Sequence, residues 1–170
     1  DLLVSGIALI LLSPVFLACA IAVKAHDGGS VFYRQKRLTL GGEEFFVLKF
    51  RSMIVNAERD GKPRLATEED DRITPVGRFL RKCRLDELPQ LINILHGDMS
   101  LVGPRPERPE LTEEYAKDMP EFLYRLKVKA GLTGYAQVTG VYDTTPFDKL
   151  TAQLTQLQRT DIPQCGPHVK

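Results

Sequence analysis

Residues 84–91 read Arg84-Leu85-Asp86-Glu87-Leu88-Pro89-Gln90-Leu91 and place two adjacent carboxylates directly before a predicted helix. The proline of this stretch is tolerated in a first helical turn, and Gly97 suits the C-terminal end of the helix. Asp86 is therefore expected near the N-cap, where free backbone N–H groups and the helix dipole favour an anion. In the ordinary interpretation Asp86 caps the helix and Glu87 pairs with Arg84; in the other, the two acids form a reaction centre.

A further helix and a hairpin are predicted upstream of this stretch. Thr74-Pro75 is typical of a helix start, and apolar residues follow at helical spacing as far as Cys83. Residues 31–36 and 45–50 are β-rich runs on either side of the turn Gly41-Gly42, which predicts a hairpin.

Two short helices are predicted downstream, over residues 110–117 and 120–127. With the elements above, they indicate an α+β fold in which a mostly helical domain carries a small β-hairpin. We find no internal repeat in the sequence.

An apolar run from Leu2 to Val23 precedes all of these elements. As one helix it would be about 33 Å long, close to the thickness of a bilayer core. Ser13-Pro14 interrupts the run near its middle, where Pro kinks or breaks a helix and Ser can bond a freed carbonyl one turn back. The residues alone leave a kinked span and a re-entrant hairpin equally open. All 23 Lys and Arg follow the run, so the later residues are expected on the cytoplasmic side.

Composition sets a few broader limits. The chain has 170 residues, enough for a domain with its own core, and because it begins at Asp1 we expect it to start inside a longer protein. A net charge of +1 gives no reason to expect a nucleic-acid partner. The three cysteines are widely spaced and odd in number, which favours a reducing compartment over a disulfide framework.

A stiff, proline-rich loop follows Gly97. Pro104, Pro106 and Pro109 hold it extended and fix Arg105 and Arg108 within it. Arginine suits bidentate binding of phosphate, and a rigid loop lowers the entropy cost of binding. The alternative is that both arginines simply form ion pairs with neighbouring glutamates.

These segments together resemble the bacterial sugar transferases, the monotopic polyprenyl-phosphate phosphoglycosyl transferases. The resemblance extends from Asp1 to about Leu150 and rests on seven segments in order. They are the apolar run with Ser13-Pro14, then residues 31–37, 49–53, 71–77, 84–91, 97–106 and 129–134. The sequence departs from the family's pattern after residue 150, where a Tyr- and Trp-rich amphipathic stretch is missing.

The resemblance implies transfer of a sugar-1-phosphate from a UDP-sugar to undecaprenyl phosphate, with release of UMP. It implies that Asp86 is the nucleophile and that Glu87 is a ligand of Mg²⁺. The chemistry of the residues agrees, because the reaction needs a nucleophile, a divalent cation and cationic groups around the phosphates. We assign Arg84, Arg105 and Arg108 to phosphate and substrate binding.

The resemblance also implies a domain organisation. Residues 1–24 are expected to form a re-entrant membrane helix broken at Ser13 and Pro14, residues 25–150 the catalytic domain, and residues 151–170 a poorly ordered tail. The protein is then expected in the inner leaflet of a bacterial cytoplasmic membrane, with its catalytic domain on the cytoplasmic face. No residue predicts the transferred sugar or the oligomeric state.

Two other functions compete with the transferase. One is a catalytically impaired membrane module that binds polyprenyl phosphate or a partner, which the altered C-terminus favours and the intact Asp86-Glu87 pair opposes. The other is a glycosyltransferase that attacks carbon instead of phosphorus. The released nucleotide separates them: UMP for the transferase, none for the module and UDP for attack at carbon.

Overall fold

The computed structural model describes residues 1–55, 57, 70–138, 151 and 155. Helices and two small sheets make up these residues, which confirms the predicted α+β class. The chain divides into two compact units. The first contains residues 1–36 and 46–97, and the second contains residues 37–45 and 98–170.

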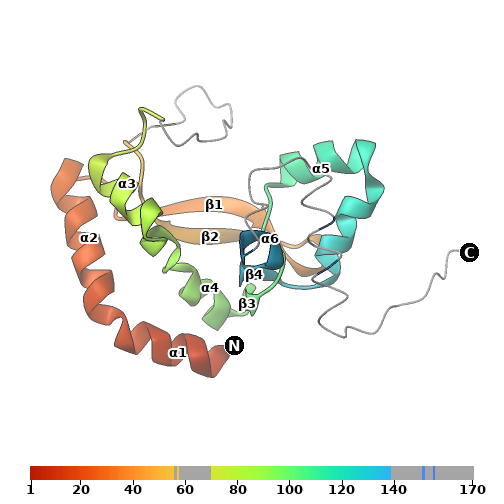
Figure 1. The fold of residues 1–170 in the computed structure, drawn as a ribbon, viewed down its shortest axis with the longest axis horizontal. Helices are drawn as coiled ribbons and strands as arrows, with labels where there is room; N and C mark the ends of the chain where they lie inside the picture. Colours follow the sequence, from red (N-terminus) through yellow and green to blue (C-terminus); the bar gives the residue numbers. More distant parts are fainter. Residues whose placement is uncertain (56, 58–69, 139–150, 152–154, 156–170) are drawn as a thin grey trace, which may run out of the picture. The chain divides into compact units, whose positions relative to one another are not determined.

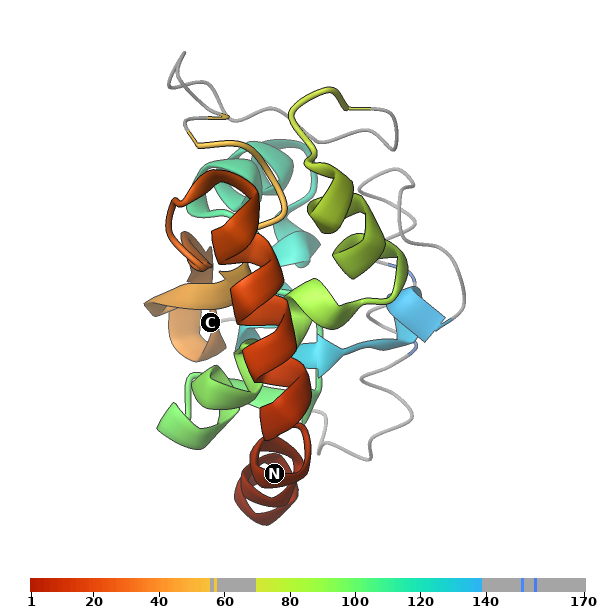
Figure 2. The same ribbon diagram turned by 90° about the vertical axis from the view of Figure 1, so that its left-hand side faces the viewer.

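The N-terminal apolar run forms two helices, α1 (Leu2–Leu11) and α2 (Ser13–Asp27), bent by 63° where they meet (Figures 1 and 2). The hydroxyl of Ser13 donates to the carbonyl of Ile10 at 2.8 Å, so the side chain takes up a carbonyl next to the break. Among the described residues no single helix is long and apolar enough to cross a membrane, whereas this bent pair is, by length and composition alone.

The predicted hairpin is present as β1 (Phe32–Leu38) and β2 (Glu44–Phe50), which pair with each other. The turn between them contains the short 3₁₀ segment η1 (Leu40–Gly42). Gly41 and Gly42 have φ angles of 72° and 82°, a region in which glycine avoids the clash of a Cβ.

Helix α3 (Pro75–Lys82) begins as its sequence predicts, because the Thr74 side chain accepts the N–H of Gly77 at 2.9 Å. The core of the first unit lies between this helix, α2 and the end of β2. It consists of Cys19, Val23, Phe50 and Leu80. The Phe50 ring packs edge-on against Phe16 and is stacked with Phe32, each at 5.4 Å between centroids. This core ties the N-terminal helices to the segment before the acidic pair.

Helix α4 (Gln90–His96) ends at Gly97 with a φ of 89°, the left-handed C-cap that the sequence predicts. Its buried Asn93 bonds the main chain of β2 in both directions. The side-chain amide donates to the carbonyl of Phe46, and its oxygen accepts the N–H of Leu48, both at 2.9 Å. Asn93 thus pairs with β2 as a neighbouring strand would.

The second unit is built on a parallel pair of short strands, β3 (Met99–Val102) and β4 (Ala130–Thr133). Between them lie α5 (Pro109–Asp118) and the 3₁₀-helix η3 (Pro120–Lys127), which correspond to the two predicted helices. The one-turn helix α6 (Tyr135–Val138) follows β4. The predicted tail, residues 151–170, lies outside the described residues except for Thr151 and Thr155.

Candidate active site

The two acidic residues lie together on η2 (Leu85–Glu87), a 3₁₀ turn between α3 and α4. The prediction that Asp86 lies near the N-cap of α4 was wrong, because Pro89 occupies that position. The chain first closes a tight turn, in which the N–H of Leu88 bonds the Leu85 carbonyl at 3.2 Å. Asp86 and Glu87 are each only 7% exposed, so both carboxylates are largely withdrawn from water.

Arg84 precedes the pair in an unusual conformation. Its φ of 57° and ψ of 17° are left-handed, and it is the only residue other than glycine with a positive φ among those described. Such a conformation costs a residue with a Cβ about 1–2 kcal/mol. The chain therefore makes a strained turn immediately before Asp86, and the Arg84 side chain remains exposed.

Glu87 has a counter-charge on the neighbouring strand. Its Oε1 accepts a hydrogen bond from Lys49 Nζ at 2.8 Å, and the two side chains are 9% and 20% exposed. Lys49 was not among the predicted site residues. The alternation along β2 could have identified it, because Lys49 shares a face with the buried Phe45 and Val47, where an unpaired charge would be costly.

The acidic pair and Lys49 are held by the same packing. Asn93 fixes α4 to β2 through Phe46 and Leu48, adjacent in sequence to Lys49. Gly77 permits α3 to approach Ser52, two residues after the end of β2, since a Cβ at Gly77 would lie 1.9 Å from the carbonyl oxygen of Ser52. The segments that carry the two carboxylates and the Lys49 ammonium are therefore held against one another.

Arg105 and Arg108 lie in the second unit, on the loop between β3 and α5. Both side chains are half-buried. Arg108 is the N-cap of α5, and its carbonyl accepts hydrogen bonds from the N–H and the hydroxyl of Thr112, each at 3.0 Å. The predicted site residues thus form two groups: Arg84, Asp86 and Glu87 in the first unit, and the two loop arginines in the second.

The carboxylates of Asp86 and Glu87 fit a hard divalent cation that shares its coordination with a substrate. Mg²⁺ commonly takes one or two carboxylates and completes its shell with phosphate oxygens and water. No cluster of three or more Asp, Glu, His or Cys ligands exists in the described part of the chain. Asp86 and Glu87 thus offer fewer ligands than a cation site made of protein side chains alone needs, so a cation here would take further oxygen ligands from other molecules.

Sequence comparison identifies the family of the chain. The family model for "Bacterial sugar transferase" matches residues 1–161. Because the match covers almost the whole chain, the protein belongs to the bacterial sugar transferase family.

Three relatives illustrate the breadth of this family. A UDP-glucose:undecaprenyl-phosphate glucose-1-phosphate transferase of Xanthomonas campestris pv. campestris is 47% identical over 86% of this chain and 30% of its own length. A protein of Aeromonas hydrophila named UDP-N-acetylgalactosamine-undecaprenyl-phosphate N-acetylgalactosaminephosphotransferase is 43% identical over 84% of this chain and 33% of its own length. A putative undecaprenyl-phosphate N-acetylgalactosaminyl 1-phosphate transferase of Bacillus subtilis (strain 168) is 41% identical over 74% of this chain and 70% of its own length. The chain thus spans about a third of the first two relatives and over two thirds of the third.

Proposed function

We propose that this protein transfers a sugar-1-phosphate from a UDP-sugar to undecaprenyl phosphate and releases UMP. The observation that carries the proposal is the buried Asp86-Glu87 pair in a chain of this family. The product would be the first lipid-diphosphate sugar of a bacterial surface glycan. The names of the relatives support both substrates.

In the first half-reaction a carboxylate oxygen of Asp86 attacks the phosphorus that bears the sugar. A bond forms between that oxygen and phosphorus, the bond from phosphorus to the bridging oxygen breaks, and UMP leaves with the electron pair. In the second, a phosphate oxygen of undecaprenyl phosphate attacks the same phosphorus and releases the carboxylate of Asp86. Splitting the transfer into two displacements is the usual advantage of a protein nucleophile.

The remaining charged residues manage the charge of the phosphates. Glu87 would hold Mg²⁺, which supplies charge neutralisation for the diphosphate, and Asp86 remains the nucleophile. Lys49 holds Glu87 in place from β2. Arg84 stands at the turn before the pair, and Arg105 and Arg108 offer planar donors to phosphate oxygens from the stiff loop.

The experiment uses donor alone, with UDP-glucose and UDP-N-acetylgalactosamine tried separately. UMP should appear in an amount close to that of enzyme, and the protein mass should rise by one sugar-phosphate. Asp86→Asn should abolish both signals, whereas Asp71→Asn, at an exposed position of the same unit, should retain them.

The other outcomes identify the competing functions. UMP that forms only after lipid acceptor is added would indicate direct transfer without a covalent intermediate on Asp86. Release of UDP would indicate attack at carbon. Failure to release any nucleotide with either donor and acceptor would favour a catalytically impaired membrane module.

The proposal includes a membrane location that suits a long lipid acceptor. Helices α1 and α2 would enter the inner leaflet of the cytoplasmic membrane and return at the bend at Leu12, directly before Ser13 and Pro14. Large apolar side chains exposed along both helices support this: Leu2, Leu3, Val4, Ile7, Ile10, Leu11, Leu17 and Ile21. The 63° bend supports a return to the same side.

Cysteine labelling tests this topology. In a background without natural cysteines, Asp1→Cys and Ala25→Cys should both react with an impermeant thiol reagent only from the cytoplasmic side. Pro14→Ala should straighten the helix and shift Asp1→Cys towards reaction from the opposite side. Labelling of Asp1→Cys from the opposite side with Pro14 intact would indicate an ordinary span.

A further inference from the structure

Arg125 is an unexpectedly buried cation in the second unit. It lies on η3, is 7% exposed, and stacks 4.3 Å from the ring centroid of the fully buried Phe122. Burial lowers the pKa of Arg125 to about 10, against the opposing effect of Glu107 and Tyr115. The guanidinium therefore keeps its charge at neutral pH. Burying a charged guanidinium costs free energy unless hydrogen bonds or a counter-charge compensate for the lost water.

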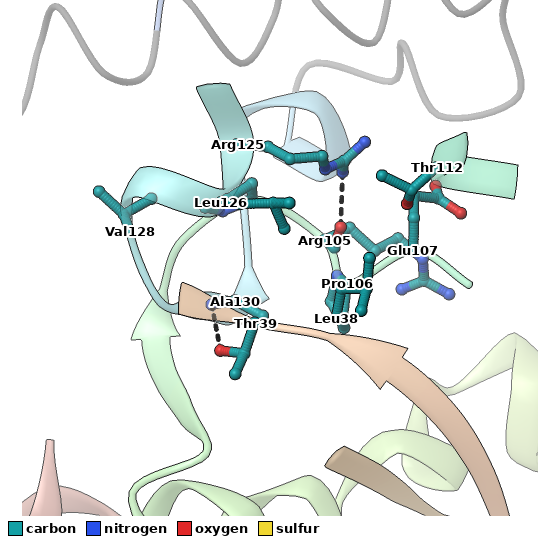
Figure 3. A pocket seen from close by; sticks show the side chains of 11 residues that line it. Leu38, Thr39, Arg105, Pro106, Glu107, Thr112, Arg125, Leu126, Val128 and Ala130 are labelled. Carbon is teal, nitrogen blue, oxygen red and sulfur yellow. Dashed lines mark hydrogen bonds between the residues drawn. The ribbon is translucent and has the colours of Figure 1, made fainter. Parts of the chain in front are cut away.

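The hydrogen bond that Arg125 makes goes to the main chain of the proline-rich loop. Its Nη2 donates to the carbonyl oxygen of Arg105 at 2.6 Å, as Figure 3 shows. In the described part of the chain, no carboxylate forms an ion pair with Arg125, and its Nη1 has no hydrogen-bond partner. The guanidinium thus makes its hydrogen bond to a main-chain carbonyl oxygen.

A loop rich in proline has fewer N–H groups to donate, so its carbonyl groups carry more of the hydrogen bonds that hold it. The loop after β3 follows this rule, with donors that come from four different elements. Gly131 N–H donates to the Pro104 carbonyl at 2.9 Å, and the Arg125 side chain donates to the Arg105 carbonyl at 2.6 Å. Leu38 N–H donates to the Glu107 carbonyl at 3.1 Å, and Thr112 N–H donates to the Arg108 carbonyl at 3.0 Å. Arg125 supplies the donor for Arg105, which lies between Pro104 and Pro106.

Two of these hydrogen bonds hold the backbone on either side of Arg105 and so restrict the direction in which its side chain leaves the main chain. Each peptide unit is planar, so a bonded carbonyl fixes the orientation of its whole plane. Gly131 holds the plane before the Arg105 Cα, and Arg125 holds the plane after it. With both flanking planes fixed, the Cα–Cβ bond of Arg105 has a single direction.

We infer that Arg125 is a positioning residue that aims Arg105 at a substrate phosphate. The inference rests on the proposed function, in which Arg105 binds phosphate. Arg125 contributes through the main chain of Arg105, and its effect on the reaction depends on the Arg105 guanidinium being present.

A double-mutant cycle on UMP release tests this dependence. Arg125→Met should lower kcat/KM about ten- to a hundredfold, as expected for a misplaced binding group, and mainly through the KM of the UDP-sugar. In an Arg105→Ala background the same substitution should change kcat/KM by less than about twofold. Equal losses in both backgrounds would overturn the inference, because a general loss of structure does not depend on the Arg105 side chain.

Two further variants keep the result interpretable. Arg125→Lys retains a cationic donor and should recover part of the loss; it also replaces Arg125→Met in the cycle if that variant does not fold. Lys127→Met, on the exposed face of η3 over the Tyr124 ring, should leave kcat/KM unchanged. A wild-type protein that releases no UMP would overturn the proposed function and this inference with it, whereas an active wild type with an additive cycle overturns only the inference.

Discussion

Lys49 Nζ on β2 lies 2.8 Å from Glu87 Oε1 on the turn η2, and both side chains are mostly buried. A carboxylate withdrawn from water is costly unless a counter-charge faces it. Lys49 therefore offsets part of the cost of burying the Glu87 carboxylate. In the proposed mechanism the same carboxylate also faces Mg²⁺, so the ammonium and the metal act on one group.

Lys49→Met should make the protein less stable and more responsive to Mg²⁺. The free energy of unfolding should fall by roughly 1–3 kcal/mol, because the Glu87 carboxylate loses the ammonium that donates to its Oε1. Thermal unfolding in detergent should show that added Mg²⁺ raises the midpoint more in this variant than in wild type. The double variant Lys49→Met/Glu87→Gln should recover stability and lose the Mg²⁺ response. Equal Mg²⁺ shifts in wild type and Lys49→Met would argue against a shared carboxylate.

Asn93→Leu should cost roughly 1–3 kcal/mol of unfolding free energy, because it leaves the Phe46 carbonyl and the Leu48 N–H without their partner. Asn93→Asp should not rescue stability, since a carboxylate cannot donate to that carbonyl. His96→Leu, at an exposed position on the same helix, is the control and should change stability by less than about 0.5 kcal/mol. Denaturant unfolding measures all three, and a stable Asn93→Leu would mean that α4 does not depend on this bond.

The left-handed Arg84 allows stability and activity to be separated. Arg84→Gly and Arg84→Ala both remove the guanidinium, so both should reduce UMP release to the same extent. Only glycine relieves the strain, so Arg84→Gly should be more stable than Arg84→Ala by about 1 kcal/mol. If Arg84→Ala proved equally stable, the positive φ of this residue would carry no measurable cost.

Close approach of two glycines predicts a severe effect of a single methyl group. A Cβ on Gly131 would lie 2.1 Å from the backbone nitrogen of Gly103, so β4 and the residue after β3 would have to separate. Gly131→Ala should cost at least roughly 2 kcal/mol of unfolding free energy. Gly6→Ala has no neighbouring atom within 4 Å and should not destabilise the protein. Comparable losses in the two variants would contradict the explanation by contact.

Asp70 predicts a dependence of stability on acid pH. The hydrogen bond from the Arg72 side chain, at 2.8 Å from Nε, lowers the pKa of Asp70 to about 2. Because the unfolded chain has the higher pKa, the folded state binds fewer protons, and the pair stabilises the fold above pH ~4. This contribution should disappear as the pH falls from about 4 to about 2. The stability difference between wild type and Asp70→Asn should therefore be constant near neutral pH and shrink across that interval; a constant difference down to pH 2 would exclude the assignment.

Local signals in the sequence predicted the elements that depend on local chemistry. Thr74 caps α3, Gly97 ends α4, and Gly41-Gly42 turns the hairpin, each as expected from one or two residues. The bend at Pro14 follows from its missing N–H in the same way.

Features that depend on distant partners were not predicted. Strands β3 and β4 are each four residues long and pair in parallel across α5 and η3, so neither carries a pattern of its own. The predicted helix over residues 120–127 gave no sign that Arg125 is buried, because its partner, the Arg105 carbonyl, lies 20 residues earlier in the chain. Asp86 was misplaced because a separate 3₁₀ turn, closed by the N–H groups of Glu87 and Leu88, precedes the helix, which begins only after Pro89.

Residues 37–45, the tip of the hairpin, belong with residues 98 onward in the second unit, whereas the rest of the hairpin belongs to the first. Thr39 illustrates the consequence, since its hydroxyl donates to the Asp98 carbonyl and accepts the Ala130 N–H. During synthesis the first unit has all its residues once Gly97 has left the ribosome. At that moment the residues that bond the hairpin tip, such as Asp98 and Ala130, have not yet emerged. A nascent chain stalled near this point would carry the acidic pair without the loop proposed to bind its phosphates.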